Sequence, residues 1–405
     1  MLNLEDFRGI VQDETLAEIY ERARGLYGKH VVHVNSTYMG GGVAEILYSL
    51  VMLMNDVGID TGWRILHGTP DFFEITKSFH NALQGSDIEL TDDKKNLYLQ
   101  INSSYSRFAH LDHDCVIVHD PQPLALIRSY RKQQPWIWRC HIDLTEPNQK
   151  LWNFLKGFLL KYDQIVVSSE KYYKKDLPVA QRIICPAINP LNHKNMDLPE
   201  STVMEYIKKA GILTDKPLIT QVSRLDPWKD PEGVVDIFEY VKEKVDCRLL
   251  FCYNLASDDP EGVQMYHKTF SKARKHVENG DILFIVGNND LLVNSIQRYS
   301  KVIIQKSIKE GFCLSVTEAL WKKTPVVASN VGGIPLQIDD GQSGFLLEPQ
   351  DNQGFADRII HILKNPKDAQ EIGKKAKEKV RQHFLITRLL SDYLNMLNAM
   401  INHSS

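Results

Sequence analysis

The chain has 405 residues, with 48 Lys and Arg against 51 Asp and Glu, which gives a formal net charge of −3. This length exceeds one ordinary hydrophobic core, so two domains are expected. The near balance of charge argues against broad binding to nucleic acid or to an anionic membrane, so any site for an anionic ligand must be local.

The six cysteines form no C-x-x-C pair and do not cluster with histidine at metal-ligand spacing, so they predict buried thiols and no metal site. The opening stretch MLNLEDFRGIVQDE lacks the basic and apolar regions of a secretory signal. No apolar run approaches the roughly 20 residues of a membrane span. A cytoplasmic protein without a membrane partner is expected.

The first predicted element in chain order is an amphipathic helix over 13–27. The β-branched run HVVHVN, 30–35, predicts a buried strand. Three glycines, 40–42, then predict a turn, and they are followed by a predicted helix over 43–55 and a strand over 61–66. A strand, a glycine turn, a helix and a second strand together make a βαβ unit.

Short apolar runs recur along the rest of the first half and predict strands over 115–120, 136–143, 164–170 and 181–188. Helical patterns separate most of these runs, and this alternation is typical of a parallel sheet that is covered on both faces. The stretch 185–200 contains three prolines and little periodicity, so it is predicted to be a linker.

The alternation resumes after this linker, with predicted strands over 217–223, 247–254, 281–287, 301–307 and 324–330. Helices are predicted over 231–244, 354–363, 367–383 and 386–401. The predicted fold class is therefore α/β, with two doubly wound, Rossmann-like domains over residues 1–190 and 200–385. Because such sheets bind ligands beyond the carboxyl ends of their strands, we expect a cleft between the two domains.

The glycine turn Gly40-Gly41-Gly42 is the first candidate for chemistry. Glycines let the backbone approach a ligand closely, and the following helix start supplies free N–H groups that suit phosphate. The turn matches neither G-x-G-x-x-G nor a phosphate-binding Walker loop, so a tight turn without a ligand is the alternative.

Two cations follow the first predicted strand of the second domain, in VSRLDPWKD, 222–230. The guanidinium of Arg224 can chelate phosphate oxygens as a fork, and Lys229 supplies a point charge. Their position at the carboxyl end of a strand favours an anion site. The alternative is a pair of solvated surface cations.

Two carboxylates, Glu310 and Glu318, flank a glycine turn and an apolar run in IKEGFCLSVTEALWKK, 308–323. If this segment is helical throughout, eight residues span about 12 Å, whereas a paired-carboxylate glycosidase needs roughly 5–9.5 Å. The spacing favours two carboxylates that hold opposite ends of an elongated ligand, with the backbone amides of 311–315 available to phosphate between them. The alternatives are an exposed helix carboxylate for Glu318 and a residue near the helix N-cap for Glu310.

Taken together, these features resemble the retaining glycosyltransferases of the GT-B fold, family 4. The resemblance runs from about residue 29 to 395 and is closest to the trehalose glycosyltransferring synthases within that family. The motifs that carry it are HVNSTYMGGGVAEILYSLV, FHNALQG, VHDPQP, WIWRCHIDL, ITQVSRLDPWKDP and the run from Lys309 to Ala319. Each motif alone is only moderately specific, but six of them in order along one chain are highly specific.

The resemblance implies a GT-B fold in which the first domain lies on the acceptor side and the second binds a nucleotide sugar. The last helix, about 386–405, would pack back on the first domain. The implied reaction is the retaining transfer of glucose from a nucleoside-diphosphate glucose to free glucose, giving trehalose and NDP, with reversibility left open. The family implies no tightly bound cofactor, no metal needed for the chemistry, with stimulation by Mg²⁺ left open, no nucleic-acid partner and a homodimer.

The resemblance also implies roles for residues of the second domain. Arg224 and Lys229 would neutralise the pyrophosphate, Glu310 would hold hydroxyls of the transferred glucose and Glu318 would bind the ribose. The backbone amides of three residues would contact sugar and phosphate: Phe312, Cys313 and Leu314. The family often has Gly where Cys313 stands, and this departure puts the fine sugar preference in doubt.

In the first domain, Gly41 and Gly42 would approach the phosphate. His141 corresponds to the family's histidine near the reacting carbon, although a structural core histidine is the alternative. Asp143 and the turn from Asp120 to Gln122 are candidates for the acceptor glucose.

Other functions remain open at this point. A trehalose phosphorylase would use phosphate where the preferred interpretation needs a nucleotide, and another family 4 transferase would use a different acceptor. A nucleotide-sugar epimerase shares the fold, and a non-catalytic sensor of sugar nucleotides is the third class. The intact set Arg224, Lys229, Glu310 and His141 argues against a sensor.

Overall fold

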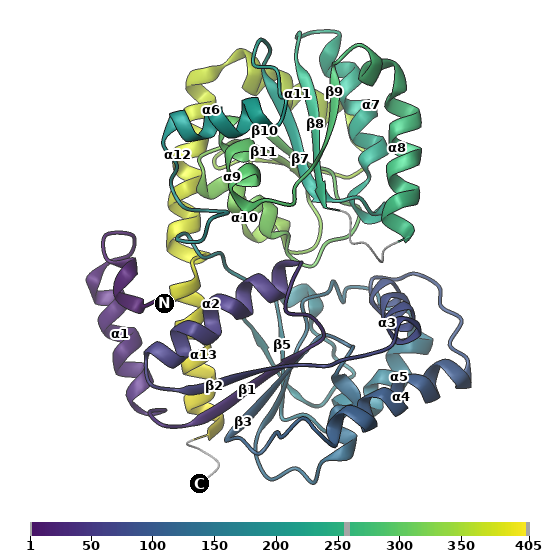
Figure 1. Ribbon diagram of the computed structural model, residues 1–405, viewed down its shortest axis with the longest axis vertical. Coiled ribbons are helices and arrows are strands. Elements are labelled where there is room, and N and C mark those ends of the chain that lie inside the picture. Colours follow the sequence, from purple (N-terminus) through teal and green to yellow (C-terminus); the bar gives the residue numbers. More distant parts are fainter. Residues whose placement is uncertain (1, 255–259, 402–405) are drawn as a thin grey trace. The chain divides into compact units, whose positions relative to one another are not determined.

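The computed structural model describes residues 2–254 and 260–401 and divides the chain into two compact units (Figure 1). Unit 1 comprises Met1–Ala187 together with Ile386–Ser405, and unit 2 comprises Ile188–Leu385. Each unit has its own sheet and is described separately.

Unit 1 contains a six-stranded parallel sheet in the order β2-β1-β3-β4-β5-β6. The strands are β1 (His30–Asn35), β2 (Asp60–Ile65), β3 (Cys115–His119), β4 (Trp136–Arg139), β5 (Gln164–Val167) and β6 (Ala180–Ile183). The strand predicted over 136–143 ends at Arg139, so Cys140 to Asp143 belong to the loop that follows the strand.

Six α-helices belong to the described part of unit 1: α1 (Asp13–Arg24), α2 (Gly42–Asp56), α3 (Pro70–Leu83), α4 (Asp92–Ser106), α5 (Gln149–Leu159) and α13 (Ile386–Ile401). The last of these, α13, contacts α1 and α2, and Figure 1 shows it beside them. The end of the chain therefore completes the first unit.

Unit 2 contains a second six-stranded parallel sheet, in the order β12-β11-β10-β7-β8-β9. The strands are β7 (Leu218–Arg224), β8 (Arg248–Asn254), β9 (Ile282–Val286), β10 (Val302–Gln305), β11 (Val326–Ser329) and β12 (Phe345–Leu347). The three-residue edge strand β12 was not predicted, because FLL is too short to show periodicity. Two parallel sheets with helices confirm the predicted fold class.

The described helices of unit 2 are α6 (Glu200–Lys209), α7 (Pro231–Lys242), α8 (Pro260–Glu278), α9 (Asp290–Tyr299), α10 (Leu314–Trp321), α11 (Asn352–Lys364) and α12 (Pro366–His383). Before them, residues 188–199 lack helix and strand, as predicted for a linker, but this segment is not loose. Asn195 is buried, its carbonyl accepts from Trp321 Nε1 at 3.2 Å, and its side-chain oxygen accepts from Lys322 Nζ at 2.9 Å. The proline-rich segment is therefore packed against the end of α10.

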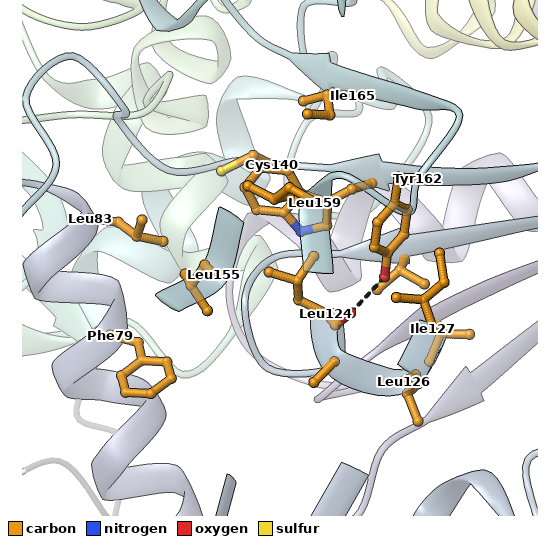
Figure 2. Packing of buried hydrophobic residues seen from close by; sticks show 14 of the residues in the cluster. Phe79, Leu83, Leu124, Leu126, Ile127, Cys140, Leu155, Leu159, Tyr162 and Ile165 are labelled. Atoms are coloured by element: carbon orange, nitrogen blue, oxygen red, sulfur yellow. Dashed lines mark hydrogen bonds between the residues drawn. The ribbon is translucent and has the colours of Figure 1, made fainter. Parts of the chain in front are cut away.

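The two faces of the unit 1 sheet differ in chemistry, because side chains alternate between faces along a strand. One face is apolar and belongs to the core drawn in Figure 2, where the Tyr162 hydroxyl donates to the Leu124 carbonyl at 2.8 Å. The other face carries buried polar side chains from neighbouring strands, among them His33, His119 and Arg139.

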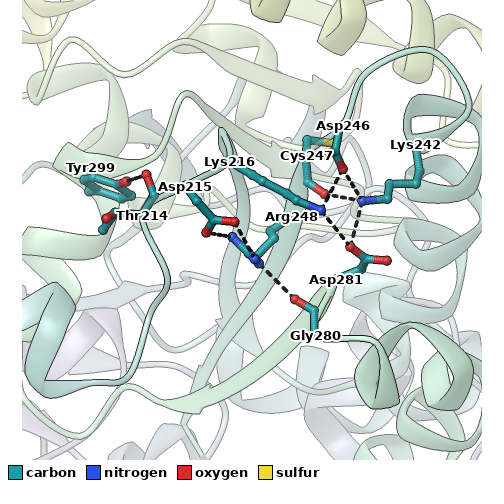
Figure 3. A network of polar contacts seen from close by, with 10 residues as sticks. All are labelled: Thr214, Asp215, Lys216, Lys242, Asp246, Cys247, Arg248, Gly280, Asp281 and Tyr299. Atoms are coloured by element: carbon teal, nitrogen blue, oxygen red, sulfur yellow. Dashed lines mark hydrogen bonds and ion pairs between the residues drawn. The ribbon is translucent and has the colours of Figure 1, made fainter.

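Unit 2 carries a charged network at the amino ends of its strands (Figure 3). Lys242 lies 2.7 Å from both Asp246 and Asp281, and Lys216 lies 2.8 Å from Asp246. Because Asp246 lies two residues before β8 and Asp281 directly precedes β9, this network lies at the edge away from the strands' carboxyl ends. It is therefore separate from the predicted site.

Among the described residues, no helix combines the length and the apolar character that crossing a bilayer requires.

Two helical glycines allow a matched test of packing. A Cβ at Gly373 in α12 would lie 2.1 Å from the Lys323 carbonyl oxygen at the end of α10, whereas a Cβ at Gly157 in α5 would meet nothing within 4 Å. We predict that Gly373→Ala destabilises the protein by about 2 kcal/mol or more through overpacking. Gly157→Ala should stabilise it by about 0.5–1 kcal/mol, because glycine is costly inside a helix. Calorimetric melting would show shifts of opposite sign, and a stable Gly373→Ala variant would contradict the close approach of α12.

Candidate functional site

The central feature of unit 2 is an ion pair between Lys229 and Glu310. Strands β7 and β10 are neighbours, so their carboxyl ends meet at one edge of the sheet. Lys229 ends the short 3₁₀ turn after β7, and Glu310 lies in the loop after β10. Lys229 Nζ contacts Glu310 Oε2 directly, and both side chains are 14% exposed. Two residues that the sequence singled out in separate motifs are thus in contact.

The charge of Lys229 is stabilised by its surroundings. Burial tends to lower its pKa, but the nearby carboxylates Glu310 and Asp226 outweigh burial, and the pKa lies above its ordinary value. Lys229 is therefore a permanent cation at this edge.

Hydrogen bonds to two backbone carbonyls fix the turn that carries Lys229. Gln221 Nε2 donates to the Lys229 carbonyl at 2.9 Å, and the backbone N–H of Ile308 donates to the Trp228 carbonyl at 2.7 Å. Asp230 follows with a positive φ of 44° and caps α7, while its second oxygen pairs with the buried Lys306. Lys306 follows β10 directly, so this pair also links the two loops.

Arg224 is the last residue of β7 rather than a loop residue, and its side chain is 48% exposed. Its Nη2 lies 3.3 Å from Asp226 Oδ2, and Asp226 Oδ1 is buried without a hydrogen-bond partner among the described residues. Sequence reasoning missed Asp226, although it lies inside the quoted motif.

The loop between Glu310 and α10 has unusual backbone geometry. Cys313 has φ 74° and ψ 77°, in the left-handed region that favours glycine, and it is the residue preceding the first turn of α10. Gln337 Nε2 donates to the Phe312 carbonyl and Gln337 Oε1 accepts from Thr317 Oγ1 at 2.6 Å. This conformation explains why glycine suits the position that Cys313 occupies here.

The surroundings of Glu318 contradict the alternative of an exposed helix carboxylate. Helix α10 begins only at Leu314, so the 12 Å estimate for a continuous helix rests on a wrong assumption. Glu318 is the fifth residue of that helix and is buried rather than exposed. Its oxygens lie 3.8 Å from Lys194 Nζ and 3.4 Å from Gln297 Nε2. Lys194 belongs to the predicted linker and carried no sequence signal.

The glycine turn of unit 1 adopts the geometry for which glycine is needed. Gly40 and Gly41 have φ of 73° and 85°, and Gly42 begins α2. Both positive-φ glycines are exposed, and a Cβ on either would meet nothing within 4 Å. The glycines therefore serve backbone conformation and not close packing within the chain.

The remaining predicted residues of unit 1 gather at the carboxyl ends of β3 and β4. Asp120 has φ 60° and its Oδ1 accepts from the backbone N–H of His141 at 2.8 Å. Burial raises the pKa of Asp120 to about 7. Asp143 uses one oxygen within its own turn, accepting from the N–H and hydroxyl of Thr145 at 2.8 and 2.5 Å. The backbone carbonyl of Gln122 accepts from Asn102 at 3.1 Å.

His141 is joined to a second histidine that the sequence did not single out. Its Nε2 lies 3.0 Å from Nδ1 of His119, the last residue of β3. Burial lowers the pKa of His141 well below its ordinary value, and the nearby Arg139 cation adds to this effect. His141 is therefore neutral at physiological pH.

Comparison with known proteins decides the family. Residues 33–174 match the family model described as trehalose synthase, N-terminal domain, and residues 203–379 match glycosyl transferases group 1. The trehalose synthase of Thermococcus litoralis is 46% identical over 400 residues, covering 98% of this chain and 97% of that protein. The chain belongs to the trehalose synthase family. It is a glycosyltransferase, as predicted from its motifs.

More distant relatives of this trehalose synthase family member are also informative. The trehalose phosphorylase of Pleurotus pulmonarius is 27% identical over 89% of this chain, but the match spans 56% of that longer protein. The structure of the trehalose 6-phosphate synthase from Burkholderia multivorans aligns with a TM-score of 0.75 at 16% identity, covering 93% of this chain and 100% of that one. This likeness confirms the predicted GT-B fold.

The environment of Cys313 predicts its reactivity. Burial, followed by the charge of Glu310, raises its pKa to about 12, so at pH 8 about one thiol in ten thousand would be ionised. We predict that iodoacetamide leaves Cys313 unmodified in the native protein, because the thiolate is the nucleophile. Cys185 is the one cysteine that is partly exposed, so it should react first. Peptide mass spectrometry after timed labelling would measure both, and rapid labelling of Cys313 would contradict the described loop.

Proposed function

We propose that this protein transfers glucose, with retention of configuration, from a nucleoside-diphosphate glucose to free glucose, giving trehalose and NDP. The family places the chain among glycosyltransferases of trehalose metabolism. The observation that carries the donor assignment is the Lys229–Glu310 pair, with Arg224 on the same strand edge. A permanent cation beside a carboxylate suits a ligand with a phosphate at one end and sugar hydroxyls at the other.

The cations would act on the departing diphosphate. A lysine ammonium has three N–H groups, so Lys229 can donate to Glu310 and still donate to phosphate oxygens. The half-exposed guanidinium of Arg224 can add a forked contact. Because negative charge develops on the leaving group, charge held in advance at this edge would stabilise the transition state.

The rest of the donor would bind along the loop and helix that follow Glu310. Glu310 would accept hydrogen bonds from the transferred glucose, and the backbone amides of Phe312, Cys313 and Leu314 would meet sugar and phosphate. Glu318 would bind the ribose. Its burial beside Lys194 supports a fixed carboxylate, since a buried charge must be paired.

Unit 1 would supply the groups around the acceptor. His141 would contact the sugar near the reacting carbon, and Asp120, Gln122 and Asp143 would bind the free glucose. The flexible backbone of Gly41 and Gly42 would approach the phosphate.

The proposed chemistry requires no covalent nucleophile. The bond between the anomeric carbon and the phosphate oxygen breaks as the acceptor hydroxyl forms a new bond on the same face. The proton of that hydroxyl passes to the departing phosphate. Lys229 and Arg224 supply the positive charge, so we propose that neither a tightly bound cofactor nor a metal is needed, and that Mg²⁺ at most stimulates the reaction.

The proposed partners are small-molecule sugars and the nucleotide sugar, with the enzyme acting as a cytoplasmic homodimer.

One alternative function, that of a trehalose phosphorylase, can be tested directly. The similarity to a trehalose phosphorylase favours a reaction in which inorganic phosphate and trehalose give glucose 1-phosphate and glucose. The cations Lys229 and Arg224 would serve either leaving group.

The first experiment incubates the purified protein with glucose and, separately, with UDP-, ADP-, GDP- or TDP-glucose, next to a tube with trehalose and phosphate. Trehalose from a nucleotide donor would support the proposal and identify the base. Glucose 1-phosphate formed only in the phosphate tube would replace it with the phosphorylase function.

Substitution of the ion pair tests the donor site. We predict that Lys229→Met lowers kcat by about 10²–10³, because one preorganised charge is lost from the transition state. The matched control is Lys301→Met, at an exposed lysine directly before β10. Steady-state kinetics would compare both with the native enzyme. Unchanged turnover in Glu310→Ala, with trehalose still formed, would refute the assignment of this pair.

The metal proposal has its own test. We predict that EDTA leaves most trehalose formation intact, since lysine and arginine provide the charge. Initial rates would be measured with EDTA, without additions and with Mg²⁺. Abolition of activity by EDTA and its return with Mg²⁺ would show that a divalent cation takes part.

A further inference from the structure

The inference concerns the polar face of the unit 1 sheet. Parallel sheets in α/β proteins are usually apolar on both faces because both are covered. Here the buried side chains on one face include His33, His119 and Arg139, each at most 1% exposed. Burying polar groups whose hydrogen bonds are incomplete costs free energy, so the polar side chains on this face reduce the stability of the fold.

The topology explains how the histidines meet. His33 on β1 pairs in register with Ile117 on β3, and His119 lies two residues beyond Ile117 on the same face. His119 in turn pairs in register with Arg139 on β4, and His141 lies two residues beyond Arg139. Strands β1 and β3 and the loop after β4 therefore present three imidazoles in sequence across three adjacent positions of the sheet.

These imidazoles form a continuous hydrogen-bonded chain. His33 Nδ1 lies 2.9 Å from His119 Nε2, and His119 Nδ1 lies 3.0 Å from His141 Nε2. The outer nitrogen of the chain, His33 Nε2, is buried without a hydrogen-bond partner in the described structure. The ring centroid of Tyr393, from α13, lies 5.9 Å from the ring centroid of His33. The chain thus ends in the protein core and not in solvent.

The number of protons on a neutral imidazole limits the tautomers that this chain of three histidines can adopt. A neutral imidazole has one N–H donor and one acceptor nitrogen. Each of the two hydrogen bonds needs one of each, so the three rings must all carry their protons on the same type of nitrogen. Burial lowers the pKa of all three rings, which keeps them neutral. Reversing one ring would break a hydrogen bond or place two N–H groups face to face.

We propose that His33 and His119 are positioning residues that commit Nε2 of His141 to the histidine chain, couple the tautomer of its ring to that of the other two rings, and leave Nδ1 as the atom that meets the sugar. The inference rests on the proposed function for the identity of the sugar. It goes beyond it by assigning two buried residues, neither of which touches substrate, to the reactivity of His141.

The other charged groups near this face do not replace the chain. Asp120 contacts the backbone N–H of His141 and not its ring nitrogens. Arg139 donates through Nη2 to Ser168 Oγ at 3.3 Å, while its Nε and Nη1 have no hydrogen-bond partner in the described structure. Among the hydrogen bonds of the described residues, the ring of His141 takes part only in the one with His119.

The test combines a spectroscopic and a kinetic readout on the full chain. Nitrogen-15 NMR of [¹⁵N]histidine-labelled enzyme distinguishes protonated from bare ring nitrogens, and single-site variants assign the signals. The native enzyme should show one common tautomer for His33, His119 and His141. His33→Phe removes both ring nitrogens two rings away from the sugar, and it should release the tautomer of His141. It should also lower kcat for trehalose formation by at least about tenfold, through loss of orientation.

Two further variants separate positioning from packing. His33→Asn keeps a group near Nδ1 that can donate or accept, so it should restore the single tautomer and bring kcat back to within about threefold of the native enzyme. Ile117→Val trims a fully buried neighbour on the same face without touching a ring nitrogen. It should lower the melting temperature while leaving both the tautomer and kcat unchanged. If His33→Phe does not fold, His33→Leu takes its place.

Mixed tautomers in the native enzyme would overturn the proposal. So would a His33→Phe enzyme whose His141 tautomer and kcat match the native values, or a kcat loss that His33→Asn does not rescue. If the native enzyme forms no trehalose from any nucleotide donor, the proposed function fails. The NMR comparison would still decide whether the chain orders His141.

Discussion

The structure of unit 2 depends on the contact between Lys229 and Glu310, because neither charge could remain buried alone. Removing one partner of a buried ion pair leaves an uncompensated charge, which costs about 3–5 kcal/mol. The pair forms because β7 and β10 are neighbours, although its members are 81 positions apart in the chain. A second ion pair, between Asp230 and Lys306, joins the same two segments after β7 and β10. A ligand phosphate would therefore meet cations whose positions are already determined.

The loop after Glu310 shows what this arrangement requires of the backbone. A Cβ at Gly333 would lie 2.7 Å from the Gly311 carbonyl oxygen, so the neighbouring turn must be glycine for the two loops to pack. Gln337 donates to the Phe312 carbonyl and so fixes the loop just before α10. Cys313 keeps its positive φ within this framework despite carrying a Cβ. The strain is tolerated because the surrounding contacts determine the conformation.

Much of this organisation could be predicted from local sequence. β1 was predicted with its observed bounds because HVVHVN is a compact β-branched run, and α13 because its apolar period is strong. Pairing between distant residues could not be predicted in the same way. Lys194 lies in a proline-rich stretch without periodicity, and only the fold brings it to Glu318. His33 and His119 looked like isolated polar residues inside apolar strands, and their contact depends on strand order, which local patterns do not contain.

Strand order also explains why the two units suit different tasks in the proposed reaction. In unit 2, strand β7 ends in Arg224, and the loops after β7 and β10 carry the Lys229–Glu310 pair. Positive charge is what a departing diphosphate requires. In unit 1 the corresponding edge ends in neutral imidazoles and in Asp120, whose pKa burial raises to about 7. The same division would hold for phosphate as the leaving group, so a nucleotide donor would have to be distinguished from phosphate by groups other than the cations Lys229 and Arg224. The buried Glu318, which lies 3.8 Å from Lys194, is the group that we propose makes that distinction.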